Sequence, residues 1–141
     1  MKSKLVAQGG GERTFVLILD PGDEAFSTIA GFAASERLSA ASLTALGAFS
    51  GATVGWFDRG AKSYRKIPVG QQCEVLSAIG DIALGDDGKP SVHIHVVLGL
   101  ADGSTRGGHL LNGVVQPTLE VLWLKRRPIC GAEGALSSAW R

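Results

Sequence analysis

The amino-acid sequence predicts an α+β domain with one principal helix and a mainly antiparallel or mixed β-sheet. One segment, residues 24–38, repeats its apolar residues at the three-to-four-residue spacing of an amphipathic helix. Several other segments are short runs of β-branched and aromatic residues, separated by Asp-Gly, Pro-Gly and similar turn signals. One helix combined with several hairpin-linked strands is typical of the α+β class.

The N-terminal elements follow from local composition. Residues 1–11 end in a Gln-Gly-Gly-Gly run and are predicted to be a flexible arm, and residues 12–127 are predicted to form the single domain. Residues 13–19 are rich in β-formers and too few for a helix, so they are the first predicted strand. The turn that follows offers Asp23 as an N-cap for the helix over residues 24–38.

The rest of the domain is predicted to be β-structure. Further strands are expected over residues 42–57, 63–67, 74–84, 92–100 and 114–124. Regularly spaced glycines in the first of these segments indicate bulges or close backbone packing. Pro117 lies inside the last segment, which predicts an edge strand or a bulge there. Residues 128–141 are rich in small residues and are predicted to be a C-terminal tail.

The composition excludes several classes of protein. With 141 residues, 45% hydrophobic and 19% charged, the chain has the composition of a globular domain with a buried core. A formal net charge of +1 provides no general attraction to nucleic acid or anionic membranes. No apolar stretch approaches the roughly 20 residues of a membrane span, so no membrane partner is expected. Cys73 and Cys130 make neither a ligand pair nor a disulfide framework, and no signal peptide is visible, which favours a cytoplasmic location.

All three histidines of the chain lie in one predicted hairpin. His93 and His95 are two residues apart in a strand, so their side chains point to the same face. An Asp-Gly turn follows this strand, and the returning segment carries His109 directly after two glycines. Glycines there allow a backbone or a ligand to approach closely. The hairpin can therefore gather three imidazoles on one face of the sheet.

Two interpretations of this triad remain open at the level of the sequence. Three imidazoles can hold zinc or another divalent metal at about 2.0–2.1 Å and leave one position open. Water in that position has its pKa lowered toward roughly 7 by zinc. Alternatively, the histidines form a polar patch that binds backbone carbonyls or lines a subunit interface.

Few other residues are candidates for chemistry. Glu74 and Glu120 each lie in an apolar strand, where a buried carboxylate is costly unless it is paired. Either could orient a histidine or act as a base. The favoured alternative is that they face solvent, or pair with Arg13 or Arg106 between subunits.

Three aromatic residues could line a ligand pocket, or could belong to the core or an interface: Trp56, Phe57 and Tyr64. Arg106, beside the two glycines of the hairpin, could bind an anion, although a solvated charge is the simpler interpretation. The cysteines have no histidine neighbour in sequence and are expected to be inert.

The sheet is expected to be only partly covered. One helix can shield part of such a sheet, and the remaining face must then meet water or another subunit. Because the strands are so apolar, contact of this face with another subunit is favoured over contact with water. The sequence therefore predicts a homo-oligomer.

A series of motifs resembles the PPC ("plants and prokaryotes conserved") domain over about residues 12–126. The motifs are Leu46-Gly47-Ala48, Val54-Gly55-Trp56-Phe57-Asp58, Tyr64, Glu74-Val75-Leu76-Ser77, His93-Ile94-His95, Gly107-Gly108-His109-Leu110 and Glu120-Val121. They occur in the family's order. The resemblance implies an α+β fold assembled as a homotrimer. Prokaryotic members are mostly uncharacterised and are often labelled DNA-binding by association.

Two departures from plant members bear on partners. Plant members join this domain to AT-hooks, whose Arg-Gly-Arg-Pro core lays arginines in the minor groove. Residues 125–128 read Lys-Arg-Arg-Pro and lack the glycine, so direct DNA binding is not expected. Residues 72–76, Gln-Cys-Glu-Val-Leu, match the plant partner-contact motif without its arginine.

The domain is also similar in fold to acetolactate decarboxylase, whose zinc is held by a His-x-His pair and a further histidine downstream. His93, His95 and His109 match that pattern, so the resemblance implies a zinc-type site. Plant members generally lack the His-x-His pair, so the fold does not need it. The predicted function is a trimeric protein of unproven activity with a three-histidine metal site and a possible small-molecule ligand. The alternative is a non-enzymatic interaction or regulatory module.

Overall fold

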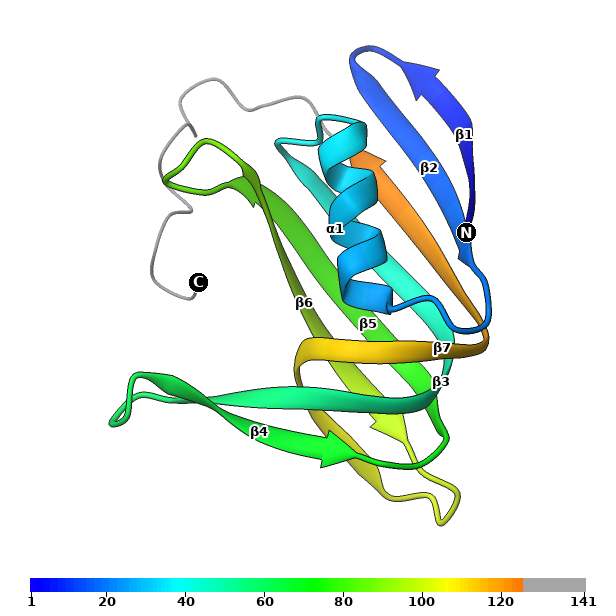
Figure 1. Cartoon of the computed structure of the whole chain (residues 1–141). Coiled ribbons are helices and arrows are strands. Elements are labelled where there is room, and N and C mark those ends of the chain that lie inside the picture. The colour runs from blue at the N-terminus through cyan, green and yellow to red at the C-terminus, as the bar shows by residue number, and fades with distance from the viewer. Residues whose placement is uncertain (126–141) are drawn as a thin grey trace.

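The computed structural model describes residues 1–125, which form one helix and one seven-stranded sheet (Figure 1). The elements are β1 (Lys2–Gly9), β2 (Glu12–Leu19), α1 (Ala25–Ser35), β3 (Ala41–Asp58), β4 (Ser63–Val69), β5 (Cys73–Leu84), β6 (Pro90–Gly99) and β7 (Thr105–Lys125). The strand order is β1-β2-β7-β6-β5-β3-β4, and all pairings of these strands are antiparallel. The α+β class with a single helix and an antiparallel sheet is confirmed.

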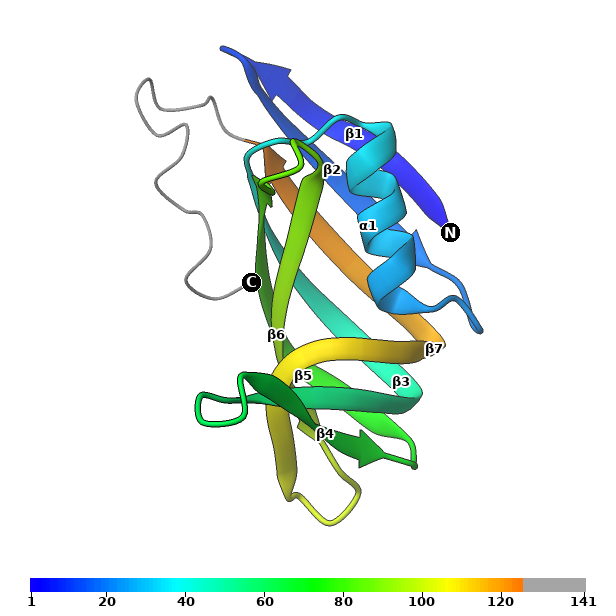
Figure 2. The ribbon, with the colours of Figure 1, turned by 60° about the vertical axis from the view of Figure 1, so that its left-hand side comes forward.

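The two longest strands, β3 and β7, close part of the sheet on itself. The start of β7 pairs with β6, its end pairs with β2, and β3 runs beside it along most of its length. The pairings of β3 with β5, β5 with β6, β6 with β7 and β7 with β3 therefore make a closed ring. Figure 2 shows the start of β7 curving beneath the helix and across the end of β3. This curvature brings β6, β7 and the end of β3 together.

The long strand β7 corrects one boundary in the predicted β-structure. The sequence predicts a returning segment after the hairpin turn and a separate last strand over residues 114–124, but one continuous strand contains both. The pairing of β7 with β3 shifts register between Val115 and Leu119, so Pro117 lies in an irregularity of the ladder, as its inability to donate requires. The predicted close packing at a glycine is confirmed at Gly47, where a Cβ atom would overlap the carbonyl oxygen of Thr118.

The predicted flexible arm over residues 1–11 is wrong. Most of it forms β1, which pairs with β2 from Lys2 opposite Ile18 onward. Gly10 and Gly11 have φ angles of 61° and 84°, so the glycine run makes the tight turn between these strands. All eight residues of β1 are exposed. Because neither face of β1 is buried, its sequence carries no alternation by which the strand could have been predicted.

The helix α1 is shorter than predicted and has a different cap. The carboxylate of Glu24, instead of Asp23, accepts the N–H groups of Phe26 at 3.1 Å and Ser27 at 2.7 Å. It also accepts the N–H of Gly113 on β7 at 3.0 Å. Burial alone would raise the pKa of Glu24, but the hydrogen bonds from Ser27, Gly113 and Phe26 outweigh it and lower this pKa. One carboxylate thus starts the helix and fastens it to the sheet.

The helix covers only one face of the sheet (Figures 1 and 2). The core between the helix and the sheet includes Trp123 and Leu17 from the strands and Ile29 from the helix, each no more than 1% exposed. Large apolar side chains that alternate with buried neighbours are exposed on the strands: Leu46, Leu76, Ile79, Val97 and Leu122. The predicted uncovered apolar surface is therefore present. Within residues 1–125, no helix has the length and hydropathy needed to cross a membrane.

Candidate metal centre

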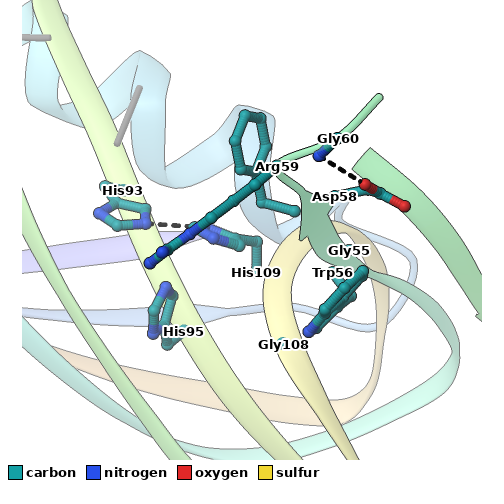
Figure 3. A pocket seen from close by; sticks show the side chains of 10 residues that line it. Gly55, Trp56, Asp58, Arg59, Gly60, His93, His95, Gly108 and His109 are labelled. Carbon is teal, nitrogen blue, oxygen red and sulfur yellow. Dashed lines mark hydrogen bonds between the residues drawn. The ribbon is translucent and has the colours of Figure 1, made fainter. Parts of the chain in front are cut away.

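The three histidines lie together on two neighbouring strands (Figure 3). His93 and His95 are on β6, and their backbone neighbours Ile94 and Val96 are buried on the opposite face. His109 is on β7 directly opposite His95 in the register of the two strands. Cross-strand partners in an antiparallel pair place their side chains on the same face. The predicted clustering of the three imidazoles is confirmed.

The ring nitrogens of the triad are close enough to share one ion. One nitrogen from each ring can be chosen so that all three lie within 4.8 Å of one another. Nε2 of His93 lies 2.8 Å from Nδ1 of His109, a hydrogen-bonding distance. The ring of His95 is edge-on to that of His109, with 4.3 Å between the ring centroids.

This geometry fits a metal ion after small side-chain rotations. Nitrogens that ligate one tetrahedral zinc at 2.0–2.1 Å lie about 3.3 Å apart. The His93–His109 separation of 2.8 Å is slightly smaller than this, and all three nitrogens lie within 4.8 Å of one another. An ion bound by His93 and His109 would therefore replace the hydrogen bond between these two rings and move their nitrogens slightly apart. A set of three imidazoles suits zinc and other divalent metals that prefer nitrogen ligands.

The protonation of His109 also suits a metal ligand. Burial, followed by the neighbouring charges of His95 and His93, lowers the pKa of His109 from 6.5 to about 4. Its ring is therefore neutral at pH 7. Neutral imidazole is the form that binds a metal.

The glycine before His109 allows this strand, β7, to approach β3 closely. Gly108 has a φ angle of 153°, and a Cβ atom there would lie 2.5 Å from the carbonyl oxygen of Gly55 on β3. The close approach predicted for the glycine pair therefore occurs at Gly108, and its partner is the backbone of β3. Tyr64 of β4 packs its ring edge-on against His109, with 4.7 Å between centroids. Strands β3, β4 and β7 thus meet behind this one imidazole.

An open pocket of about 900 Å³ lies in front of the triad. It is lined by Gly55, Trp56, Phe57, Asp58, Arg59, Gly60, His93, His95, Gly108 and His109. Two of the three predicted aromatic residues are among these, whereas Tyr64 lines a smaller pocket of about 220 Å³ on another side of His93 and His109.

Two residues near the triad were not singled out from the sequence. Arg59 lies in the turn between β3 and β4, and its side chain extends toward the histidines (Figure 3). In sequence it is one charge in a polar turn, and no local signal distinguishes it. Asp81 of β5 is the cross-strand partner of His93. Its position could have been inferred only from the register of β5 and β6.

The predicted carboxylate candidates do not join the site. Glu74 and Glu120 are both exposed, in agreement with the favoured alternative. On β5, Glu74 is five residues from Ile79, the partner of His95, which corresponds to about 17 Å along a strand. Glu120 is eleven positions beyond His109 on β7.

The arginines and the cysteine that the sequence singled out lie away from the histidine pocket. Arg13 pairs with Glu36 at 3.0 Å within the chain. Arg106 is exposed, donates to the carbonyl of Thr105 and is not among the residues that line the histidine pocket. Cys73 is buried and unpaired, and burial raises the pKa of its thiol, as expected of an inert cysteine. Cys130 and the predicted tail over residues 128–141 lie outside the described residues.

Solved structures of other proteins are similar to this one. A plant- and prokaryote-conserved protein from Pyrococcus horikoshii is 32% identical with a TM-score of 0.78, over 83% of this chain and 80% of that one. A metal-containing protein from Archaeoglobus fulgidus is 33% identical with a TM-score of 0.74, over 89% and 84% of the two chains. A protein from Ralstonia eutropha, named as a candidate DNA-binding protein, is 28% identical with a TM-score of 0.73, over 81% and 78%.

The predicted likeness in fold to acetolactate decarboxylase is also found. A Staphylococcus aureus protein described as similar to that enzyme has a TM-score of 0.52 at 14% identity, over 77% of this chain and 50% of that one. At this identity the likeness concerns the fold alone. A search of curated proteins gave no match. The family model of the Plants and Prokaryotes Conserved domain matches residues 6–125, nearly all of the chain, and the protein belongs to this family.

Proposed function

We propose that this protein is a homotrimeric PPC-domain protein whose His93, His95 and His109 hold a divalent metal ion of the zinc type. The observation that carries the proposal is the convergence of three ring nitrogens within 4.8 Å. The hydrogen bond between two of these rings and the low pKa of His109 support it further. The metal-containing relative from Archaeoglobus fulgidus is consistent with it.

The pocket in front of the histidines supports a small-molecule ligand. Three protein ligands leave a further position on the metal, and such open sites are typical of metals that act on a ligand. When bound, the metal would act as a Lewis acid toward a ligand in the pocket. Arg59, Trp56 and Phe57 would orient that ligand, since they line the same space.

The uncovered face of the sheet supports self-association. Leu46 and Ile79 expose 63% and 61% of their surface, an exposure that contact with another copy would reduce. A trimer is the assembly that the family resemblance implies. The buried, unpaired Cys73 is in keeping with a reducing compartment, and we place the protein in the cytoplasm.

Direct DNA binding is not part of the proposal. One relative is named as a candidate DNA-binding protein, but non-specific binding to DNA requires several phosphate contacts from lysines and arginines. The formal net charge of this chain is only +1. Salt-sensitive retardation of DNA at sub-micromolar protein would contradict this part of the proposal.

Elemental analysis tests the metal centre. Protein purified without chelator and without a metal-affinity column should contain about one divalent metal per chain. His93→Ala, His95→Ala and His109→Ala should each lose this metal and keep the circular dichroism spectrum of the folded protein. If no stoichiometric metal is found, and added zinc does not raise the melting temperature, the metal centre is wrong and an interaction module becomes the better description.

A further inference from the structure

We propose that the pocket selects a small organic carboxylate, held between the guanidinium group of Arg59 and the open position of the metal. The inference rests on the proposed function, because the metal provides the second binding point. It assigns a ligand class to the pocket and a specificity-determining role to Arg59.

The position of Arg59 is the first observation. It follows the end of β3, and its side chain reaches back from the turn over the pocket toward His93, His95 and His109 (Figure 3). All ten lining residues lie within residues 1–125, and Arg59 is the only lysine or arginine among them. A guanidinium group, which stays charged over the whole ordinary pH range, therefore faces the triad across this pocket.

The charge balance of the pocket is the second observation. Among the described residues of the lining, Asp58 is the one acidic side chain, and its Oδ1 already accepts the N–H groups of Gly60 at 2.9 Å and Ala61 at 3.0 Å. Its Oδ2 lies 3.8 Å from the guanidinium of Arg65. Asp58 is thus held in the turn. A carboxylate in this pocket would lie close to both a guanidinium group and a divalent ion, and both interactions are attractive.

The shape and lining of the pocket favour a carboxylate over a phosphate. The planar fork of arginine matches the two oxygens of a carboxylate. Phosphate sites usually add several backbone N–H groups, often from a helix N-terminus. The N-terminus of α1 is instead occupied by Glu24. Trp56 and Phe57, which are 55% and 36% exposed, line the pocket and can pack against an apolar substituent of the ligand.

Benzoate is a suitable probe, because it combines a carboxylate with a flat apolar ring. Its binding to the zinc-loaded, full-length protein is measured by calorimetry, beside benzamide and inorganic phosphate. The variants are Arg59→Gln and, as a matched control, Lys62→Gln, which removes a positive charge from the same turn outside the pocket lining. Zinc content is measured for each protein. Cobalt(II)-substituted protein provides a second signal, because a ligand that enters the metal's coordination shell changes its visible spectrum.

We expect benzoate to bind the zinc-loaded protein and to shift the cobalt spectrum, and benzamide to bind more weakly. Arg59→Gln should lower the affinity for benzoate by about 10-fold or more, which is the usual loss for a hydrogen bond to a charged group. Its zinc content should be unchanged. Lys62→Gln should change benzoate affinity less than about 2-fold, because an exposed charge contributes little.

The outcomes separate the two proposals. If zinc binds but benzoate affinity is the same in Arg59→Gln and Lys62→Gln, the role of Arg59 is overturned and the metal centre stands. If phosphate binds as tightly as benzoate, the assignment to carboxylates is overturned. If the protein holds no metal, both the metal centre and the carboxylate site as stated here are wrong.

Discussion

Nε2 of His93 and Nδ1 of His109 lie 2.8 Å apart, so these two rings from β6 and β7 share one proton or one ion. A hydrogen bond between them requires that one nitrogen is protonated and the other is not. A metal ion bound by both nitrogens would take the place of that proton. Protons and metal therefore compete for the same pair of atoms, and this competition makes the metal centre sensitive to pH.

The first prediction concerns metal binding and pH. Zinc should raise the melting temperature clearly at pH 8, and this increase should be lost as the pH drops toward the pKa of His109 at about 4, because an imidazole must be neutral to bind zinc. Differential scanning fluorimetry with and without zinc at several pH values measures the effect. A zinc-dependent increase of the same size at pH 8 and pH 4 would contradict binding through His109.

The second prediction concerns the metal-free protein. Because the pKa of His109 is lowered to about 4, its ring is neutral in both the folded and unfolded chain above pH 6.5 and adds no pH dependence there. Between about 6.5 and about 4 the unfolded chain binds a proton that the folded chain does not. The free energy of unfolding should therefore fall as the pH drops through this range, and level off below it.

Urea unfolding of chelator-treated protein between pH 7.5 and pH 4.5 tests this second prediction. His109→Asn removes the titrating group, so its stability should depend less steeply on pH than that of the unmodified protein. Parallel curves for the two proteins would show that His109 does not carry the effect.

The third prediction concerns the glycine beside the triad. Gly108→Ala should destabilise the protein by about 1–3 kcal/mol, the usual cost of forcing an atom into a filled space, because its Cβ would lie 2.5 Å from the carbonyl oxygen of Gly55. Relief of this overlap should push β7 from β3 and weaken zinc binding through His109. Gly70→Ala is the control, since a Cβ there meets nothing within 4 Å. Equal melting temperatures for the two variants would contradict the prediction.

The fourth prediction concerns assembly. Light scattering should report a trimer at micromolar concentration. Leu46→Lys should shift the protein toward monomers with its secondary structure retained, because the side chain is 63% exposed in the single chain and a charge would be costly in an apolar contact. Leu46→Met keeps the apolar character and should stay trimeric. A monomeric unmodified protein would refute the proposed assembly.

The elements that could be predicted from the sequence are those with one buried face. The β6 segment alternates buried Ile94 and Val96 with His93 and His95. Both its strand conformation and the common face of its histidines therefore follow from this two-residue periodicity. The helix was predicted for the same reason. By contrast, β1 buries neither face, and Glu24 replaced Asp23 as the cap because it also reaches Gly113 on a distant strand.

By itself the sequence determined that three histidines would share one hairpin face, because two-residue periodicity and a short turn are local properties of the chain. Only the tertiary structure decided what surrounds them. Arg59 and Tyr64 belong to β3, β4 and their turn, and they reach the triad because β7 pairs with both β6 and β3 at His109. That pairing joins segments about fifty residues apart, and its register depends on bulges at glycines whose partners lie on other strands.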